Sequence, residues 1–299
     1  MTAPISSDNS YLELVRLSEV KPEPINWLWP GRIAKGKITF IAGHPGLGKS
    51  QITASIAATV STGGIWPADE VSADPGNVLI LSAEDGLADT IKPRLLAAGA
   101  DTNRIEAIEA VREGDQRFPF SLERDLELLR DTEASLLIVD PLAAYMGGVD
   151  SHKDADVRAF LAPLSEIAQK MEMAVVCVSH LNKSSGNEAV LRISGSIGFV
   201  ATARAVHIVT TDSTDRSRRL FVSMKNNLAL DQGGLAFRIE SKEPEPGIMT
   251  SAVDWESEAI SISADEALES LNPEERGALD DAKEFLEELL ADSPVPGTT

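Results

Sequence analysis

Residues 37–51 read KITFIAGHPGLGKSQ, an apolar run followed by a glycine-rich segment that ends in lysine, serine and glutamine. The spacing of Gly43, four residues, Gly48, Lys49 and Ser50 is the phosphate-loop pattern G-x-x-x-x-G-K-[ST], placed where a strand passes into a helix. Glycines let the backbone curl so that its N–H groups face phosphate oxygens, and the following helix adds the positive end of its dipole. An ordinary glycine-rich turn does not need Lys-Ser at this offset. The segment therefore predicts a site for ATP or GTP.

The loop supplies most of the expected nucleotide contacts. We expect the ammonium of Lys49 to reach the β and γ phosphates and the hydroxyl of Ser50 to hold Mg²⁺. The residues predicted to bind the nucleotide are Gly43, His44, Pro45, Gly46, Leu47, Gly48, Lys49, Ser50 and Gln51.

Length and composition limit the class of protein. A chain of 299 residues can hold one large α/β domain with appendages, or two small domains. No apolar run approaches the ~18 residues that a membrane span requires, and the polar N-terminus lacks the pattern of a secretory signal. The single cysteine, Cys177, lies in an apolar run and predicts a buried thiol. We expect a soluble, cytoplasmic protein without a membrane partner.

The formal charge of −20 is unevenly distributed. Residues 243–299 contain 16 acidic and 2 basic residues, whereas residues 181–242 contain 9 basic and 5 acidic residues. Binding to nucleic acid usually needs a basic surface, and the basic stretch keeps that function open. An acidic tail could screen the basic stretch, repel non-specific DNA or keep the protein soluble.

From Lys37 onward, short apolar runs alternate with helical stretches, which predicts an α/β fold with a mostly parallel sheet, helices on both faces and an antiparallel extension. The predicted strands are 38–42, 78–82, 136–139, 174–179, 205–210, 220–224 and 235–239. The predicted helices are 49–60, 87–98, 122–131, 154–171 and 188–203.

The chain divides into three parts in this interpretation. Residues 1–36 form an N-terminal arm whose tryptophans pack in the core or, alternatively, flank an adenine or a neighbouring subunit. Residues 37–245 form the nucleotide-binding domain. KEPEPG at 242–247 breaks the chain, and 246–299 form an acidic tail with a helix near 273–291.

Polar side chains follow the predicted strands. Asp140 ends SLLIVD in the Walker B form, where a carboxylate reaches the magnesium shell, and Glu84 in VLILSAEDG is placed to act as general base. His180 ends AVVCVSH and is a candidate sensor of the γ phosphate. Because ligands of open α/β sheets bind at the carboxyl ends of strands, these groups are expected to converge. Taken singly, each is also explained by a turn or by a satisfied surface or core histidine.

The segments WLWPGRIAKGKITFIAGHPGLGKS, SAEDG, LLIVDPLAAYMGG, VSHLNKSSG and ISGSIGFVATARAVHIV resemble the RepA-like AAA family ATPases of the RecA and DnaB helicase superfamily, which occur on plasmids, phages and integrated elements. The resemblance covers about residues 20–245. It implies a RecA-like core, ATP with Mg²⁺ as cofactors, a homo-hexameric ring, and translocation on single-stranded DNA or replication initiation with partner proteins. It assigns Lys49 and Ser50 to phosphate and magnesium, Glu84 to catalysis, Asp140 to Walker B, and His180 to coupling with DNA.

One departure from this family concerns the residues that a neighbouring subunit contributes. Such rings usually add a lysine and an arginine in a lysine-x-arginine pattern, and this chain has Lys225 but Asn227 in place of the arginine. Arg204, Arg218 or Arg219 could substitute.

Two further expectations concern DNA. The loop LNKSSGNEAVLRISGS has the small residues and cations, Lys183 and Arg192, of a segment that meets phosphates in a ring's pore, although a flexible surface loop is the alternative. A winged-helix DNA-binding region that often follows the last helix in the RepA-like relatives is expected to be missing or removed.

Three functions remain open from the sequence. The first is an ATP-hydrolysing ring that acts as a DNA helicase or translocase. The second is a regulatory or loading module that binds ATP, hydrolyses little and recruits a partner through its acidic tail. A small-molecule phosphotransferase is weaker, because the sequence shows no set of residues for an acceptor.

Overall fold

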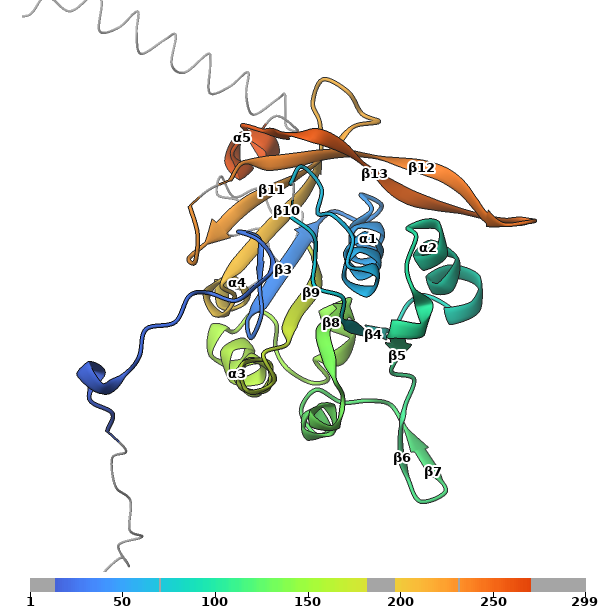
Figure 1. Ribbon diagram of the computed structural model, residues 1–299. Coiled ribbons are helices and arrows are strands. Elements are labelled where there is room, and N and C mark those ends of the chain that lie inside the picture. The colour runs from blue at the N-terminus through green and yellow to red at the C-terminus, as the bar shows by residue number, and fades with distance from the viewer. Residues whose placement is uncertain (1–13, 70, 182–196, 231, 270–299) are drawn as a thin grey trace, which may run out of the picture.

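The structure is a computed structural model that describes residues 14–69, 71–181, 197–230 and 232–269 (Figure 1). A nine-stranded sheet with the order β13-β12-β11-β10-β3-β9-β8-β4-β5 forms the centre of this part of the chain. Its strands are β3 (Ile38–Gly43), β4 (Asn77–Ser82), β5 (Ile105–Ala107), β8 (Ala134–Asp140), β9 (Ala174–His180), β10 (Ala205–Thr211), β11 (Arg219–Asn226), β12 (Gly234–Glu245) and β13 (Ile248–Ile260). Short hairpins are formed by β1 (Trp27–Trp29) with β2 (Ile33–Ala34) and by β6 (Val111–Glu113) with β7 (Gln116–Phe118).

The sheet is parallel from β10 to β5 and antiparallel from β10 to β13. Strand β3 is buried along its whole length, and β9 is buried except at its last residue. Buried central strands of this kind require cover on both faces, and their sequences are accordingly continuous apolar runs. The prediction of a RecA-like P-loop core with an antiparallel extension is confirmed.

Helices cover both faces of the sheet (Figure 1). They are α1 (Lys49–Thr62), α2 (Lys92–Ala97), α3 (Asp154–Met171), α4 (Ile197–Thr202) and α5 (Ala264–Glu269). Helices α1 and α2 bury Ile52 and Leu95 against one face of the sheet, and α3, α4 and α5 bury side chains such as Leu161 and Phe199 against the other. The sheet lies between the two apolar cores, and the ends of its strands remain available for polar groups.

Most predicted elements agree with the structure. The predicted strands match β3, β4, β8, β9, β10 and β11, and the predicted helices 49–60 and 154–171 match α1 and α3. The segment predicted as helix 87–98 begins with a wider π turn at Leu87–Ile91 and continues as α2. Pro93 explains this turn, since it has no N–H to donate to the carbonyl four residues earlier. Of the predicted helix 188–203, only α4 lies within the described residues.

The prediction of a helix over residues 122–131 is wrong. The structure has only a short 3₁₀ segment, Leu126–Asp131. The buried carboxylate of Asp125 accepts the backbone N–H of Ser121 at 2.8 Å and also pairs with Arg124 at 2.7 Å. These local bonds favour a turn over the start of a helix.

The prediction that KEPEPG separates the nucleotide-binding domain from an acidic tail is also wrong. Residues 234–260 form one long hairpin, β12 and β13, with Gly247 at φ +82° in the turn. The carboxylate of Glu243 accepts the N–H of Gly247 at 2.8 Å, which stabilises this turn. The hairpin lies alongside α1 and α2 (Figure 1), and the sheet therefore continues past residue 245 into the segment that we expected to be an acidic tail. The predicted helix near 273–291 lies outside the described residues.

Within the described residues, the N-terminal arm packs on the domain from Trp27 onward. Trp29 is 1% exposed and stacks on Trp66 with ring centroids 4.8 Å apart, so core packing accounts for this tryptophan. Residues 14–26 extend away from the body, and Leu14 and Leu17 are exposed (Figure 1). Among the helices of the described part, none combines the length and the apolar character that crossing a membrane requires.

Candidate nucleotide-binding site

The glycine-rich segment joins β3 to α1 through a backbone turn that excludes side chains. A Cβ atom at Gly43 would lie 2.5 Å from the carbonyl oxygen of Val209, and one at Gly48 would lie 2.4 Å from Cδ1 of Ile239. Gly48 also has φ +90°, directly before α1. Gly43 is therefore required for the close approach of β3 to β10, and Gly48 for the turn into the helix.

Lys49 is the first residue of α1 and is 5% exposed. Its Nζ donates hydrogen bonds to the carbonyl of Gly43 at 2.9 Å and to the carbonyl of His44 at 3.0 Å. Burial lowers the pKa of the Lys49 ammonium, and the nearby carboxylates of Asp140 and Glu84 oppose this shift. An ammonium has three donors, so two bonds to the loop leave one donor for an anion.

The strand ends bring the predicted catalytic groups to the same edge of the sheet. Strands β3, β9, β8 and β4 are parallel neighbours, and the register pairs Gly43 with His180 and Ser82 with Asp140. Glu84 follows β4 by two residues and is exposed. Lys49, Ser50, Glu84, Asp140 and His180 all line one cavity of about 480 Å³ at this edge. The expected convergence is present, while the chemical role of each residue stays a prediction.

The loop residues contribute to this cavity in two ways. Pro45, Gly46, Gly48 and Gln51 line it together with Lys49 and Ser50. Gly43 and His44 face the ammonium of Lys49 with their carbonyls, and Leu47 packs against the apolar core.

Asp140 is a partly buried carboxylate at the cavity. Burial raises the pKa of Asp140, a side-chain hydrogen bond from Ser50 opposes the rise, and the charge of Asp85 adds to it. The Ser50 hydroxyl and the Asp140 carboxylate line the same cavity, as the Walker A and Walker B interpretation expects. A cation beside them would favour the ionised form of Asp140.

Two further titratable side chains near Lys49 and Asp140 have shifted pKa values. Burial and the charge of Lys49 lower the pKa of His180, which favours the neutral imidazole. Burial and the charge of Asp140 raise the pKa of Tyr145 to about 12. Tyr145 lies in the short helical turn Leu142–Tyr145 that directly follows the Walker B strand.

The sequence interpretation missed five residues that line the cavity, namely Asp85, Arg94, Val178, Ile239 and Ser251, and it named Arg219 only as a substitute for the arginine of a neighbouring subunit. Arg94 Nη1 pairs with Asp85 Oδ2 at 2.5 Å, and the side-chain amide of Gln51 is hydrogen-bonded to the hydroxyl of Ser251 at 2.8 Å. The antiparallel pairing of β10 and β11 explains the position of Arg219, because it sets Arg219 opposite Thr211 at the carboxyl end of β10. Among the missed residues, Asp85 had a local signal, because it directly follows Glu84 in SAEDG.

Lys225 lies away from the cavity of its own chain. It pairs with Val206 near the start of β10, at the opposite edge of the sheet, and its Nζ donates to the carbonyls of Val200 at 2.6 Å and Ala203 at 2.8 Å. The ammonium therefore caps α4, and a role for Lys225 in a neighbour's site stays a prediction. Arg204 is exposed at this same edge, and Arg218 is bound in ion pairs, so Arg219 is the candidate arginine that reaches the cavity of its own chain. Lys183 and Arg192 lie outside the described residues.

A parallel sheet with a glycine-rich turn, a buried lysine and a Walker B carboxylate at one edge defines a P-loop ATPase. A family model described as an AAA domain matches residues 7–186, which is more than half of the chain. The chain belongs to this AAA domain family, whose members generally hydrolyse ATP with Mg²⁺. The search of curated proteins returned no match.

Proposed function

We propose that the cavity binds ATP and hydrolyses the bond between its β and γ phosphates. The observation that carries this proposal is that Lys49, Ser50, Glu84, Asp140 and His180, from four strand ends, line a single cavity. Side chains that serve only in turns or on a solvated surface would not be expected to line one shared cavity.

Each residue of the cavity has a separate role in the proposed hydrolysis. The exposed carboxylate of Glu84 orients a water molecule and takes its proton as the water oxygen bonds to the γ phosphorus and ADP leaves. Lys49 exchanges part of its bonding to the loop carbonyls for the phosphate oxygens. His180, kept neutral by burial, donates or accepts a hydrogen bond near the γ phosphate without adding charge. Arg219 adds a cation from the same chain.

The residues present also fit Mg²⁺. The ion prefers a few oxygen ligands and keeps several waters, and Ser50 and Asp140 supply a hydroxyl and a carboxylate to the same cavity. Within the described ranges, no group of three or more His, Cys, Asp and Glu residues could hold a metal by itself. This fits an ion that is held jointly by the protein and the triphosphate. When bound, Mg²⁺ would neutralise charge that develops on the phosphates.

We further propose a homo-hexameric ring that acts on single-stranded DNA as a RepA-like helicase or translocase, in replication of a plasmid, phage or integrated element and with replication proteins as partners. The support is the set of motifs around the site, the basic stretch of residues 181–242 and its pore-loop candidates Lys183 and Arg192. We expect such a protein in the cytoplasm.

A regulatory module with little hydrolysis is the second candidate, and it is favoured by one observation. Asn227 occupies the position at which ring helicases of the RecA and DnaB superfamily usually have their arginine. Its backbone N–H donates to the carbonyl of Arg204 within the same chain. An arginine finger contributes about 10³ to 10⁵ in rate where it has been studied, so its loss would leave a slow ATPase.

Steady-state ATP hydrolysis with and without single-stranded DNA separates the two candidates. For the motor we expect stimulation by DNA, and a loss of hydrolysis of about 100-fold or more in Lys49→Ala and Glu84→Gln. Glu84→Gln should still bind ATP, because it changes the base and leaves the phosphate loop intact. A rate near background that DNA does not change would support the switch. Equal hydrolysis by wild type and both variants would refute an ATPase at this cavity.

A further inference from the structure

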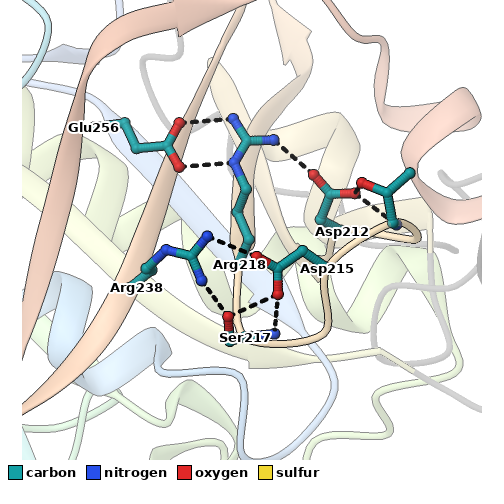
Figure 2. A network of polar contacts seen from close by, with 7 residues as sticks. Asp212, Asp215, Ser217, Arg218, Arg238 and Glu256 are labelled. Carbon is teal, nitrogen blue, oxygen red and sulfur yellow. Dashed lines mark hydrogen bonds and ion pairs between the residues drawn. The ribbon is translucent and has the colours of Figure 1, made fainter.

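Two arginines connect the turn between β10 and β11 to the β12–β13 hairpin (Figure 2). Arg218 donates from Nε and Nη2 to the two carboxylate oxygens of Glu256, each at 2.7 Å, and from Nη1 to Asp212 at 2.6 Å. The bond to Glu256 is bidentate, which fixes direction as well as distance. Arg218 is thereby held between the turn and β13.

A second set of contacts lies beside the first. Arg238 on β12 donates to Asp215 at 2.6 Å and to the hydroxyl of Ser217. Asp215 in turn accepts the backbone N–H of Ser217 at 2.9 Å and its hydroxyl at 2.7 Å. The turn is therefore attached to β12 through Asp215 and Ser217 and to β13 through Arg218, and Figure 2 shows these side chains gathered at one place.

The register places this network and Arg219 on opposite sides of the sheet. Arg219 pairs with Phe237, and Phe237 pairs with Trp255; residues paired in this way share a face. Phe237 and Trp255 pack with the core on the side of α1, so Arg219 also points to that side, where the cavity lies. Arg218 directly precedes Arg219, and Glu256 directly follows Trp255. Both side chains therefore belong to the other side of the sheet.

Arg219 differs from the other cations at the cavity. Lys49 is bonded to loop carbonyls, and Arg94 is paired with Asp85. Arg219 is half-buried, and in the part of the chain that the structure describes its guanidinium has neither a hydrogen bond nor an ion pair. A long side chain without partners is positioned only by its backbone, and the network holds that backbone one residue away.

We infer that Arg218, Arg238, Asp212, Asp215 and Glu256 are positioning residues that hold Arg219 toward the nucleotide. The inference rests on the proposed function, because it needs a nucleotide in the cavity. The side chains of Arg218 and Glu256 are 24% and 37% exposed, and their bidentate bond fixes the turn relative to β13. The network therefore sets the geometry of the strand that carries Arg219.

The test is a double-mutant cycle on the dissociation constant for MgATP, measured by titration calorimetry on the full chain, with thermal unfolding of each variant. Arg219→Ala should weaken binding about tenfold or more, as expected for loss of a charge-assisted hydrogen bond. Glu256→Gln should weaken binding about threefold, and the double variant should bind as Arg219→Ala does, because a positioning residue has nothing left to position. Glu258→Gln, an exposed carboxylate two residues away on the same strand, is the matched control and should bind as wild type.

Losses that simply add in the double variant would overturn the inference, as would wild-type affinity in Arg219→Ala. If Glu256→Gln unfolds, the same cycle is run with Asp215→Asn, which removes the partner of Arg238 at a half-exposed position. Failure of the proposed function looks different. In that case wild type binds no MgATP, or Lys49→Ala binds it as well as wild type does.

Discussion

At the scale of single residues, the site depends on the absence of side chains as much as on charge. Gly46 and Gly48 both have positive φ, but their surroundings differ. A Cβ atom at Gly46 would meet nothing within 4 Å, whereas one at Gly48 would meet Ile239 from the β12–β13 hairpin. Comparing substitutions at the two glycines therefore distinguishes the cost of backbone strain from the cost of a steric clash.

We predict that Gly48→Ala lowers the free energy of unfolding by about 2–4 kcal/mol, from left-handed strain and overpacking together. Gly46→Ala is the matched control and should lose only about 1–2 kcal/mol, since it adds strain alone. Urea denaturation followed by tryptophan fluorescence measures both. Adding Ile239→Val to Gly48→Ala removes the clashing Cδ1 and should recover part of the loss. Equal losses in the two glycine variants would show that the hairpin does not press on the loop.

At the scale of elements, the β12–β13 hairpin is part of the ATPase domain and forms one wall of the cavity. Trp255 packs against Phe237, with ring centroids 5.1 Å apart, and against Phe221 at 5.9 Å. Its Nε1 donates to the hydroxyl of Ser55 on α1 at 3.0 Å. The acidic residues of this segment alternate with such inward side chains, so a high negative charge here is the solvent-exposed face of a strand.

We predict that Trp255→Ala lowers the free energy of unfolding by about 2–4 kcal/mol, because the half-buried ring leaves a gap between α1 and the sheet. Trp255→Phe keeps an aromatic ring and loses the bond to Ser55, and should cost about 1 kcal/mol. Chemical denaturation monitored by circular dichroism gives both values. An unchanged free energy of unfolding in Trp255→Ala would mean that residues 246–260 behave as part of the acidic tail that the sequence predicted.

At the scale of the whole molecule, the proposed function requires several copies and a polyanion. The nucleotide cavity lies at one edge of the sheet, while Lys225 and Arg204 lie at the other. A ring would therefore have to bring the second edge of one copy to the cavity of the next for these cations to act. The formal charge of −20 makes association with DNA dependent on local basic segments.

We predict that the chain with MgATP forms particles of about six copies, measured by light scattering, and that its affinity for single-stranded DNA falls by roughly 10-fold or more between 50 and 200 mM salt. Lys183→Ala and Arg192→Ala should each reduce the salt dependence by about one released ion. The control is Lys170→Ala, an exposed cation on α3 outside the basic stretch, which should leave that dependence unchanged. A monomer with salt-independent binding would exclude the ring with a phosphate-contacting pore.

The sequence by itself determined the elements whose signals are local. The phosphate loop has a fixed spacing, the central strands are continuous apolar runs because helices cover them on both faces, and Glu84, Asp140 and His180 could be assigned to strand ends. Parallel strands present their carboxyl ends at one edge, so even the convergence of these groups followed from the order of strands and helices.

Only the tertiary structure decided which residues from the antiparallel part complete the cavity. Gln51 and Ser251 are 200 residues apart in sequence, and Arg219 reaches the cavity from the beginning of a strand because β11 runs against β10. Nothing in the local sequence distinguishes Arg219 from Arg218. Their opposite roles come from the alternation of side chains across a strand, and the register that sets this alternation is fixed by burial of Phe237 and Trp255 in the core.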